Sequence, residues 1–340
     1  MSGGEGPLPQ ALVVAALARF GIGGDASAAF VRHGENTTYR IDAADGRRFA
    51  LRIHRPGYQT AEAIGSELAW MDSLRESGVR TAPAVPGIDG DPLQVAHGPG
   101  GVVRTAVLFE WIDGVPLSAV GELEPWARLG ELMARIHVHG RHWARPAWFT
   151  RPAWDAEALV GDDPRWGPPD PLRLFSDEDR LGLEECRAEV RERLHGIGFA
   201  SDRFGLIHAD LGFENVLVAE DGTVTIIDFD DSGDSWFLYE LASALYAHDR
   251  TAGFGERRDA LVAGYRRIRE LPDELLAELP TFLMARRIQT LGWVFSRPET
   301  AHAERQRPRR LESTPPATRE YLDWARSHPF AVRVRAGRPG

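Results

Sequence analysis

Apolar and polar residues follow two different periods along the N-terminal third of the chain. Residues 8–20 (LPQALVVAALARF) carry apolar side chains at helical spacing and stop at Gly21, which predicts a short amphipathic helix. Strand-like runs rich in β-branched and aromatic residues follow at 28–33, 37–42 and 48–54. Asp45-Gly46, between the last two runs, is a hairpin turn signal, so the pattern predicts an antiparallel sheet.

A second helix is predicted over residues 60–78 (TAEAIGSELAWMDSLRESG), with a glycine at its end. Its apolar stripe consists of Ile64, Leu68, Met71 and Leu74. Glu67 falls on this stripe, because it lies three residues after Ile64 and four before Met71. A carboxylate directed into a core needs a positive partner, so the helix predicts a buried ion pair.

The remainder of the chain changes from strand to helix. Residues 103–117 (VRTAVLFEWIDGVPL) are predicted to form a strand that runs into a connector containing glycine and proline. Helical patterns then dominate from about residue 125 to about residue 328, around an irregular stretch rich in tryptophan and proline at 143–172. The basic run at 304–310 (ERQRPRR) is interpreted as a solvated surface loop.

Residues 208–231 (HADLGFENVLVAEDGTVTIIDFDD) interrupt the helical region with a predicted hairpin. If Asp221-Gly222 forms the turn, Glu220 pairs with Thr223, and counting outward places Asn215 opposite Asp228. Opposed residues have Cβ atoms about 4.5–5.5 Å apart, which would bring an amide oxygen next to a carboxylate. Such oxygen ligands, completed by phosphates, suit Mg²⁺.

The motif His-x-Asp-x-x-x-x-Asn, followed by a hairpin and Asp-Phe-Asp, resembles the catalytic loop and metal-binding segment of kinases. In the form found here it is most similar to the aminoglycoside phosphotransferase and choline kinase family. The resemblance implies an α+β, bilobal, protein-kinase-like fold, whose N-lobe is an antiparallel sheet with one main helix. The implied boundaries are an N-lobe at 1–109, a linker at 110–116 and a mostly helical C-lobe at 117–340.

The same resemblance implies an enzyme that transfers the γ-phosphate of ATP or GTP to a hydroxyl of a small-molecule acceptor, such as an antibiotic. It also implies roles for the polar residues of loop 208–215 and of the hairpin. Asp210 would accept the proton of the acceptor hydroxyl, and His208 would hold the loop in shape. Asn215 and Asp228 would hold Mg²⁺, and Asp230 would either ligate a second metal ion or cap the turn before Gly233. Glu240 stands where many relatives have an aspartate that supports the loop, which leaves its role open.

For the nucleotide, ATP or GTP, the family uses a lysine on the third strand, but this chain has none. Arg52 holds that position, and the kinase pattern pairs it with Glu67; a guanidinium can bind phosphate oxygens in a fork. Asn36 and Thr37 lie in the place of the phosphate-covering loop, and a plain turn is as good an interpretation of them. The backbone of the linker region would bind the purine, through Phe109, Glu110, Trp111 and Ile112.

Composition narrows the remaining classes of function. All 40 basic residues are arginine, so Schiff-base chemistry, pyridoxal phosphate attachment and a P-loop are excluded. The net charge of −10 without a basic stripe argues against nucleic acid. The single cysteine, Cys186, excludes an internal disulfide, and no apolar run reaches the roughly 18 residues of a membrane span. A cytoplasmic protein, monomeric or homodimeric, is expected.

The acceptor is the least determined part of the prediction. Aminoglycosides or other hydroxylated antibiotics, homoserine, choline-like amino alcohols, sugars and protein Ser/Thr all remain open. Five residues are candidates for acceptor contacts, with surface charge and core packing as the plainer interpretation: Glu214, Asp231, Asp234, Trp236 and Trp293. A non-catalytic nucleotide-binding pseudokinase is the alternative from another class, and a zinc site at His137, His139 and His142 is disfavoured for lack of a carboxylate.

Overall fold

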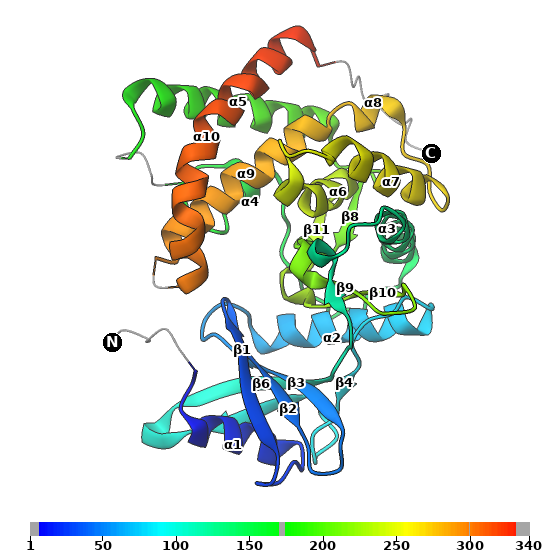
Figure 1. Cartoon of the computed structure of the whole chain (residues 1–340), viewed down its shortest axis with the longest axis vertical. Helices are drawn as coiled ribbons and strands as arrows, with labels where there is room; N and C mark the ends of the chain where they lie inside the picture. The colour runs from blue at the N-terminus through cyan, green and yellow to red at the C-terminus, as the bar shows by residue number, and fades with distance from the viewer. Residues whose placement is uncertain (1–6, 170–173, 299, 331–340) are drawn as a thin grey trace. The chain divides into compact units, whose positions relative to one another are not determined.

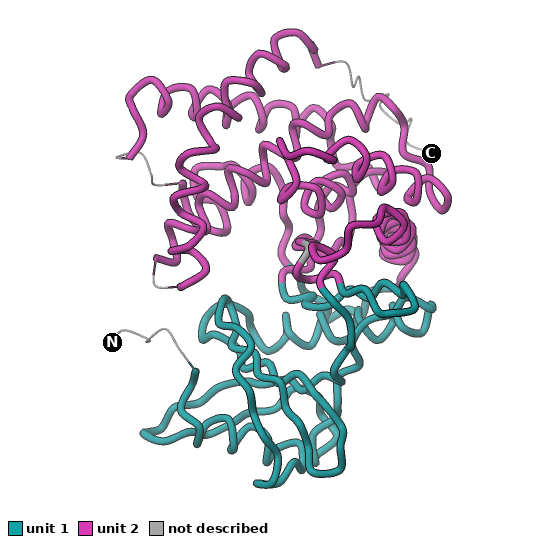
Figure 2. Tube along the Cα trace, in the orientation of Figure 1, with its two compact units in different colours: residues 1–115, 144–151, 217–230 teal, residues 116–143, 152–216, 231–340 magenta. Residues whose placement is uncertain are grey.

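The computed structural model describes residues 7–169, 174–298 and 300–330. The chain forms two compact units, coloured separately in Figure 2. Unit 1 comprises residues 1–115, 144–151 and 217–230, and unit 2 comprises residues 116–143, 152–216 and 231–340. The first division falls inside the predicted linker. The hairpin residues 217–230, which the sequence assigned to the C-lobe, belong to unit 1 instead.

Unit 1 is built on an antiparallel sheet (Figure 1). Its strands lie in the order β1-β2-β3-β6-β4, and β5 pairs with β6. They span β1 Ser27–His33, β2 Asn36–Asp42, β3 Arg48–His54, β4 Ala84–Val85, β5 Leu93–His97 and β6 Val103–Glu110. The three predicted strand runs are therefore confirmed as β1, β2 and β3, with the turn at Asp45-Gly46 between the last two.

Two helices cover this sheet, and both were predicted. The apolar stripe of α1 (Gln10–Arg19) buries Leu12, Val13, Ala16 and Leu17 in one cluster with inward side chains of β2, β3 and β6. Helix α2 (Ala61–Glu76) begins at Thr60, whose side chain accepts the backbone N–H of Ala63 and so caps the helix. The carboxylate of Glu67 is buried on the inner face of α2, as its position on the stripe predicted.

The hairpin of β9 (Val216–Val218) and β10 (Val224–Ile226) has a different turn from the predicted one. The N–H of Ala219 donates to the carbonyl of Thr223, and the N–H of Gly222 donates to the carbonyl of Ala219. Three residues therefore form the loop, with Gly222 at a φ of 75°. The predicted pairing of Glu220 with Thr223 is wrong by one residue, and the pairing of Asn215 with Asp228 derived from it does not follow.

Unit 2 is mostly helical, with one two-stranded sheet of β8 (Phe204–Ile207) and β11 (Gly233–Trp236). Its helices are α3 Glu124–His142, α4 Ala156–Val160, α5 Asp177–Ile197, α6 Phe237–Leu245, α7 Phe254–Arg266, α8 Asp273–Leu276, α9 Leu279–Ser296 and α10 Ala301–Ser327; the short strand β7 (Val115–Pro116) begins at the unit boundary. Helices α3 and α7 approach so closely that a Cβ atom on Gly264 would lie 1.8 Å from the carbonyl oxygen of Ala127. The observed α+β architecture confirms the predicted fold class.

The basic run at 304–310 lies inside α10 rather than in a loop, so that prediction is wrong. Pro308 within the run lowers intrinsic helix propensity and gave the appearance of a loop. The helix begins at Thr300, whose hydroxyl caps the N–H of Ala303, and it packs against α9 and α5. In the described part of the chain, no helix is both long and apolar enough to cross a membrane.

Candidate active site

The Asp228-Phe229-Asp230 segment leaves the end of β10 in unit 1. The Phe229 ring is buried and meets Trp70 of α2 edge to face, with ring centroids 5.5 Å apart. Arg151 and Gln59 donate to the carbonyl of Asp230, Gln59 at 2.9 Å. Asp228 has a φ of 66°, a left-handed conformation that aspartate tolerates better than most residues. The backbone is thus fixed on both sides of the two carboxylates.

Arg52 of β3 and Glu67 of α2 form the predicted buried ion pair. Two parallel hydrogen bonds of 2.8 Å join their side chains, which are 5% and 0% exposed. The guanidinium also lies 3.3 Å from Asp228 Oδ1 and stacks over the Phe109 ring. Burial acts against the charge of Arg52, but Glu67, Asp230 and Asp228 outweigh it and raise the pKa above its ordinary value. Arg52 is therefore a permanent, rigidly held cation.

The two carboxylates of this segment have unequal surroundings. Asp228 Oδ2 accepts a hydrogen bond from Arg32 of β1. Asp230 Oδ2 accepts one of 2.8 Å from Asn36, whereas Asp230 Oδ1 is buried without a hydrogen-bond partner. Burial, followed by the nearby charges of Glu67 and Asp228, raises the pKa of Asp230 to about 7, although Arg52 opposes the shift. A buried carboxylate oxygen without a partner favours the binding of a cation.

Of the three residues predicted to hold metal, Asp228 and Asp230 lie together in this segment, whereas Asn215 belongs to unit 2. Asp228 and Asp230 supply oxygen donors, and Mg²⁺ is commonly bound through one or two carboxylates, with phosphates and water as the other ligands. Within the described residues there is no cluster of three or more His, Cys, Asp or Glu side chains that could hold a metal ion. The segment therefore suits an ion shared with phosphates better than a closed structural site.

The residues predicted to contact the nucleotide already have partners within unit 1. Thr37 is buried, and its hydroxyl lies 2.8 Å from Nδ1 of His33. The backbone N–H groups of Glu110 and Trp111 donate to the carbonyls of Pro83 and Arg48, at 2.9 and 3.1 Å. A purine would therefore need other backbone groups of the segment 109–112 than these two amide hydrogens.

In unit 2, the loop that contains His208 is held by a buried carboxylate. Glu240 of α6 accepts the backbone N–H of His208 at 2.9 Å and that of Ala209 at 2.8 Å. Ala209 has a φ of 68°, and such strained residues cluster at functional sites. Burial alone would raise the pKa of Glu240, but His137, His208 and the loop N–H groups outweigh it and lower the pKa. Glu240 thus supports the loop, which answers the question that its sequence position left open.

Asp210 follows in the same loop, and both of its carboxylate oxygens have partners in unit 2. The Asn215 amide donates to Asp210 Oδ2 at 3.1 Å and to its carbonyl at 2.9 Å. The guanidinium of Arg286, on α9, pairs with Oδ1. Hydrogen bonds of 3.2 Å to the Tyr239 hydroxyl and 3.1 Å to Gln289 fix Arg286 in turn. The orientation of Asp210 is therefore set before any ligand binds.

The residues predicted to contact the acceptor have different environments. Trp236 is in the core, with its indole N–H bonded to the Gly198 carbonyl at 2.8 Å, so the expectation of an acceptor contact does not fit it. Asp231 is buried and Asp234 half-buried, and their carbonyls accept hydrogen bonds from Trp154. Glu214 is exposed, and Trp293 packs beside His302 and under Arg297.

Among the described residues, histidines 137, 139 and 142 are not part of a group of three or more side chains that could hold a metal ion. His137 is buried, its Nδ1 lies 2.8 Å from the Tyr265 hydroxyl, and its Nε2 lies 3.7 Å from Glu240. Burial lowers the pKa of His137. It therefore serves as a neutral core residue next to Glu240, which holds the loop containing His208.

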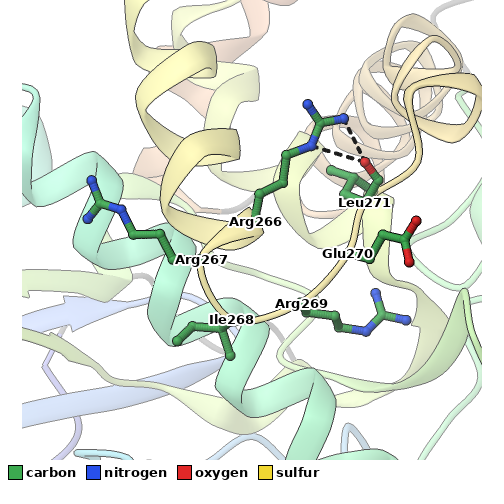
Figure 3. A pocket seen from close by; sticks show the side chains of 6 residues that line it. All are labelled: Arg266, Arg267, Ile268, Arg269, Glu270 and Leu271. Atoms are coloured by element: carbon green, nitrogen blue, oxygen red, sulfur yellow. Dashed lines mark hydrogen bonds between the residues drawn. The ribbon is translucent and has the colours of Figure 1, made fainter.

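One pocket of unit 2 lies at the end of α7. Figure 3 shows its lining, the consecutive residues 266–271. The Arg266 guanidinium is turned back onto the Leu271 carbonyl, and Arg269 donates to the Tyr265 hydroxyl. None of the predicted site residues lines this pocket, so it carries no part of the predicted chemistry.

Two arginines of the site were missed from the sequence. Arg32 lies 196 residues from Asp228 in the chain, and Arg286 lies 76 residues from Asp210. Arg32 belongs to an ordinary strand pattern and Arg286 to an ordinary helix pattern, and neither lies in a local motif. The sequence indicated only that Asp210 and Asp228 need positive partners, and residue spacing does not show which arginines these are.

The architecture and the two loops define the class of the protein. An antiparallel sheet carries a buried guanidinium–carboxylate pair next to an Asp-Phe-Asp segment, and a helical unit carries a fixed His-x-Asp loop. These are the parts of a kinase-like phosphotransferase, in which positioning and electrostatics supply most of the rate.

Comparison with known proteins defines the family. The sequence model of the phosphotransferase enzyme family (APH) matches residues 28–275, so the chain belongs to this family. The solved structure of a microcompartment-associated aminopropanol kinase is 31% identical, with a TM-score of 0.84, and the match covers 93% of this chain and 98% of that one.

Two curated relatives extend the comparison. The amicoumacin kinase of Bacillus subtilis (strain 168) is 26% identical over 300 residues, which cover 83% of this chain and 84% of that protein. The homoserine kinase of Bradyrhizobium diazoefficiens is 31% identical over 235 residues, which cover 64% and 63%. The protein is a small-molecule kinase of the APH family, and the predicted resemblance is confirmed.

Proposed function

We propose that the protein transfers the γ-phosphate of ATP or GTP to the hydroxyl group of a small amino alcohol. The observation that carries the proposal is the fixed carboxylate of Asp210, oriented by Asn215 and Arg286 within the predicted catalytic loop. Asp210 accepts a hydrogen bond from the acceptor hydroxyl, aligns its oxygen with the phosphorus atom and takes the proton late in the transfer.

Unit 1 binds the donor nucleotide in this proposal. Arg52 is held by Glu67 and directs its charge to the phosphates, as the lysine of other kinases does. Asp228 and Asp230 would hold Mg²⁺ in unit 1, and the ion would neutralise part of the charge of the phosphates. Asn36 serves the site by holding Asp230, and the segment 109–112 receives the purine.

The names of two similar proteins, an aminopropanol kinase and a homoserine kinase, support a small amino alcohol as the acceptor. Aminopropanol and homoserine each carry a hydroxyl and an amine on a short carbon chain. An amine bears a positive charge at neutral pH, and the exposed carboxylate of Glu214, next to Asn215 in sequence, is a suitable partner for it. A second candidate acceptor is a larger hydroxylated antibiotic, because the chain is 26% identical to an amicoumacin kinase over 83% of its length.

A transfer assay tests this function. Purified protein is incubated with Mg²⁺, ATP or GTP labelled at the γ-phosphate, and a panel of acceptors: 1-amino-2-propanol, homoserine, choline, amicoumacin, an aminoglycoside, a sugar and a serine peptide. We expect labelled product with one or more amino alcohols and none with the peptide. Product with the sugar alone would overturn the acceptor class, and label in the peptide alone would indicate a protein kinase.

The non-catalytic alternative gives a different result in the same assay. A pseudokinase would bind nucleotide without forming product from any acceptor or from water. The fixed orientation of Asp210 argues against it, because a protein that only binds nucleotide has no use for an oriented base. Product formation that is lost in Asp210→Ala would exclude the pseudokinase.

A further inference from the structure

Arg32 stands in the same cross-strand row as Arg52. Arg32 pairs with Thr38 in β2, and Thr38 pairs with Arg52 in β3. Directly paired residues point to the same face of a sheet, so both arginines lie on one face. The row depends on an irregularity in β1 between Phe30 and Arg32, where the register shifts by one residue. Such a bulge re-aims a side chain, and here it directs Arg32 toward the Asp-Phe-Asp segment.

Each of the two arginines pairs with one carboxylate oxygen of Asp228. Arg52 lies near Oδ1, and Arg32 bonds to Oδ2. Their freedom to move is very different, because the Arg52 side chain is 5% exposed and pinned by Glu67, whereas the Arg32 side chain is 41% exposed. Arg32 is therefore the partner that a ligand can displace.

A metal ion bound to Asp228 would compete with Arg32 for the same carboxylate. A guanidinium and a divalent cation bound to the same carboxylate repel each other, because both are positively charged. Binding of one therefore weakens binding of the other. Phosphates change this balance, because they attract the displaced guanidinium strongly and pair with it in a charge-assisted geometry.

We propose that Arg32 is a second phosphate-binding residue, which holds Asp228 in the nucleotide-free protein and transfers to the nucleotide phosphates when a metal ion takes its place. The inference rests on the proposed nucleotide site and assigns it two arginines where other kinases have one lysine. Metal and nucleotide binding are then linked through Arg32, and each favours the other.

Removal of Arg32 should change metal and nucleotide binding in opposite directions. Without its competitor, Asp228 binds the metal ion alone about 3–10-fold more tightly. Without its contact to phosphate, the nucleotide with metal binds about 10-fold more weakly. A side chain that only stabilised the sheet would weaken both or change neither.

The experiment measures two dissociation constants on the full chain. Titration calorimetry gives the affinity for Mg²⁺ alone and for the Mg²⁺ complex of a non-hydrolysable ATP or GTP analogue, in the absence of any acceptor. The variants are Arg32→Ala and Arg32→Gln. Arg19→Ala is the matched control, because the Arg19 side chain is 40% exposed and its ion pair with Asp89 lies elsewhere in unit 1. Thermal melting confirms that each variant is folded.

Tighter binding of Mg²⁺ alone together with weaker binding of the nucleotide, in both Arg32 variants and not in Arg19→Ala, is the expected result. Any other combination overturns the inference, including unchanged constants or a loss of both affinities. If the wild-type protein binds neither nucleotide, the proposed function fails first. If it binds nucleotide and the Arg32 variants match it, only the role of Arg32 fails.

Discussion

The acidic loops of the two units differ in how completely their polar groups are satisfied. In unit 2, Glu240 accepts two loop N–H groups, and Asp210 has a partner at each oxygen. In unit 1, Asp230 has a buried oxygen without a hydrogen-bond partner, and Asp228 pairs with Arg52 at one oxygen and with the half-exposed Arg32 at the other. Buried polar groups are rarely left unsatisfied, and a bound cation would satisfy the carboxylate of Asp230.

This difference separates two tasks of a phosphotransferase. A base must be aligned before the acceptor arrives, because misplacement by even 1 Å slows the reaction greatly. A site for metal and triphosphate must open, bind and release in every cycle, so its carboxylates are held by partners that a ligand can replace.

Asp210→Asn should lower kcat about 1000-fold, because an amide cannot accept the hydroxyl proton. Nucleotide affinity should stay within about 2-fold of the wild type, since the change leaves unit 1 intact. Steady-state kinetics and calorimetry measure the two quantities. Asp202→Asn, a change at an exposed carboxylate paired with Arg203, serves as the control and should behave as the wild type. A small loss of kcat would remove Asp210 as the base.

Arg52→Ala should lower kcat/KM for the nucleotide about 100-fold, whereas Arg52→Lys keeps measurable activity. The alanine variant also leaves Glu67 buried without a partner, which costs about 3–5 kcal/mol of unfolding free energy. Kinetics as a function of nucleotide concentration and chemical denaturation measure these effects. Wild-type behaviour of Arg52→Ala would show that the ion pair has no part in nucleotide use.

Glu240→Ala should destabilise the protein by about 2–4 kcal/mol, because two buried N–H groups lose their acceptor. Glu240→Gln retains one carbonyl oxygen and should lie between the alanine variant and the wild type. Denaturant unfolding measures the order. Equal stability of all three proteins would mean that the loop does not depend on this side chain.

Asp230→Asn should stabilise the metal-free protein at pH 8 by about 1–3 kcal/mol and have little effect at pH 4. The pKa of Asp230 is raised to about 7 in the folded state, so its contribution to stability is full below pH 4 and is lost as the pH rises through 7. Asparagine keeps the oxygen that Asn36 binds and removes the charge. Melting curves at both pH values, with and without Mg²⁺, measure the change; a less stable variant at pH 8 would contradict it.

Periodicity and turn signals predicted much of this molecule. They placed β1, β2, β3, β6, α1 and α2. The inward direction of Glu67 led, with the kinase pattern, to its pairing with Arg52. These features follow from local spacing and from the requirement that a buried charge be paired.

The features that the sequence did not predict depend on contacts between residues far apart in the chain or on packing between elements. The Ala219 N–H, and not that of Glu220, donates to the carbonyl of Thr223, which sets the hairpin register. The basic run at 304–310 continues a helix, α10, that packs against α9. Residues 217–230 group with unit 1 partly through a bridge between Thr81 and Ile226. Arg32 and Arg286 reach the site over long stretches of chain, and only the folded topology brings them there.

The most direct test of the division of labour measures nucleotide binding and phosphate transfer side by side in two variants. Asp210→Asn should bind nucleotide like the wild type and transfer almost no phosphate in a single turnover. Arg52→Ala should bind poorly, and its transfer should recover in part at high nucleotide concentration. If Asp210→Asn transferred phosphate at the full rate, or if both variants lost binding and transfer equally, the assignment of separate tasks to the two loops would be contradicted.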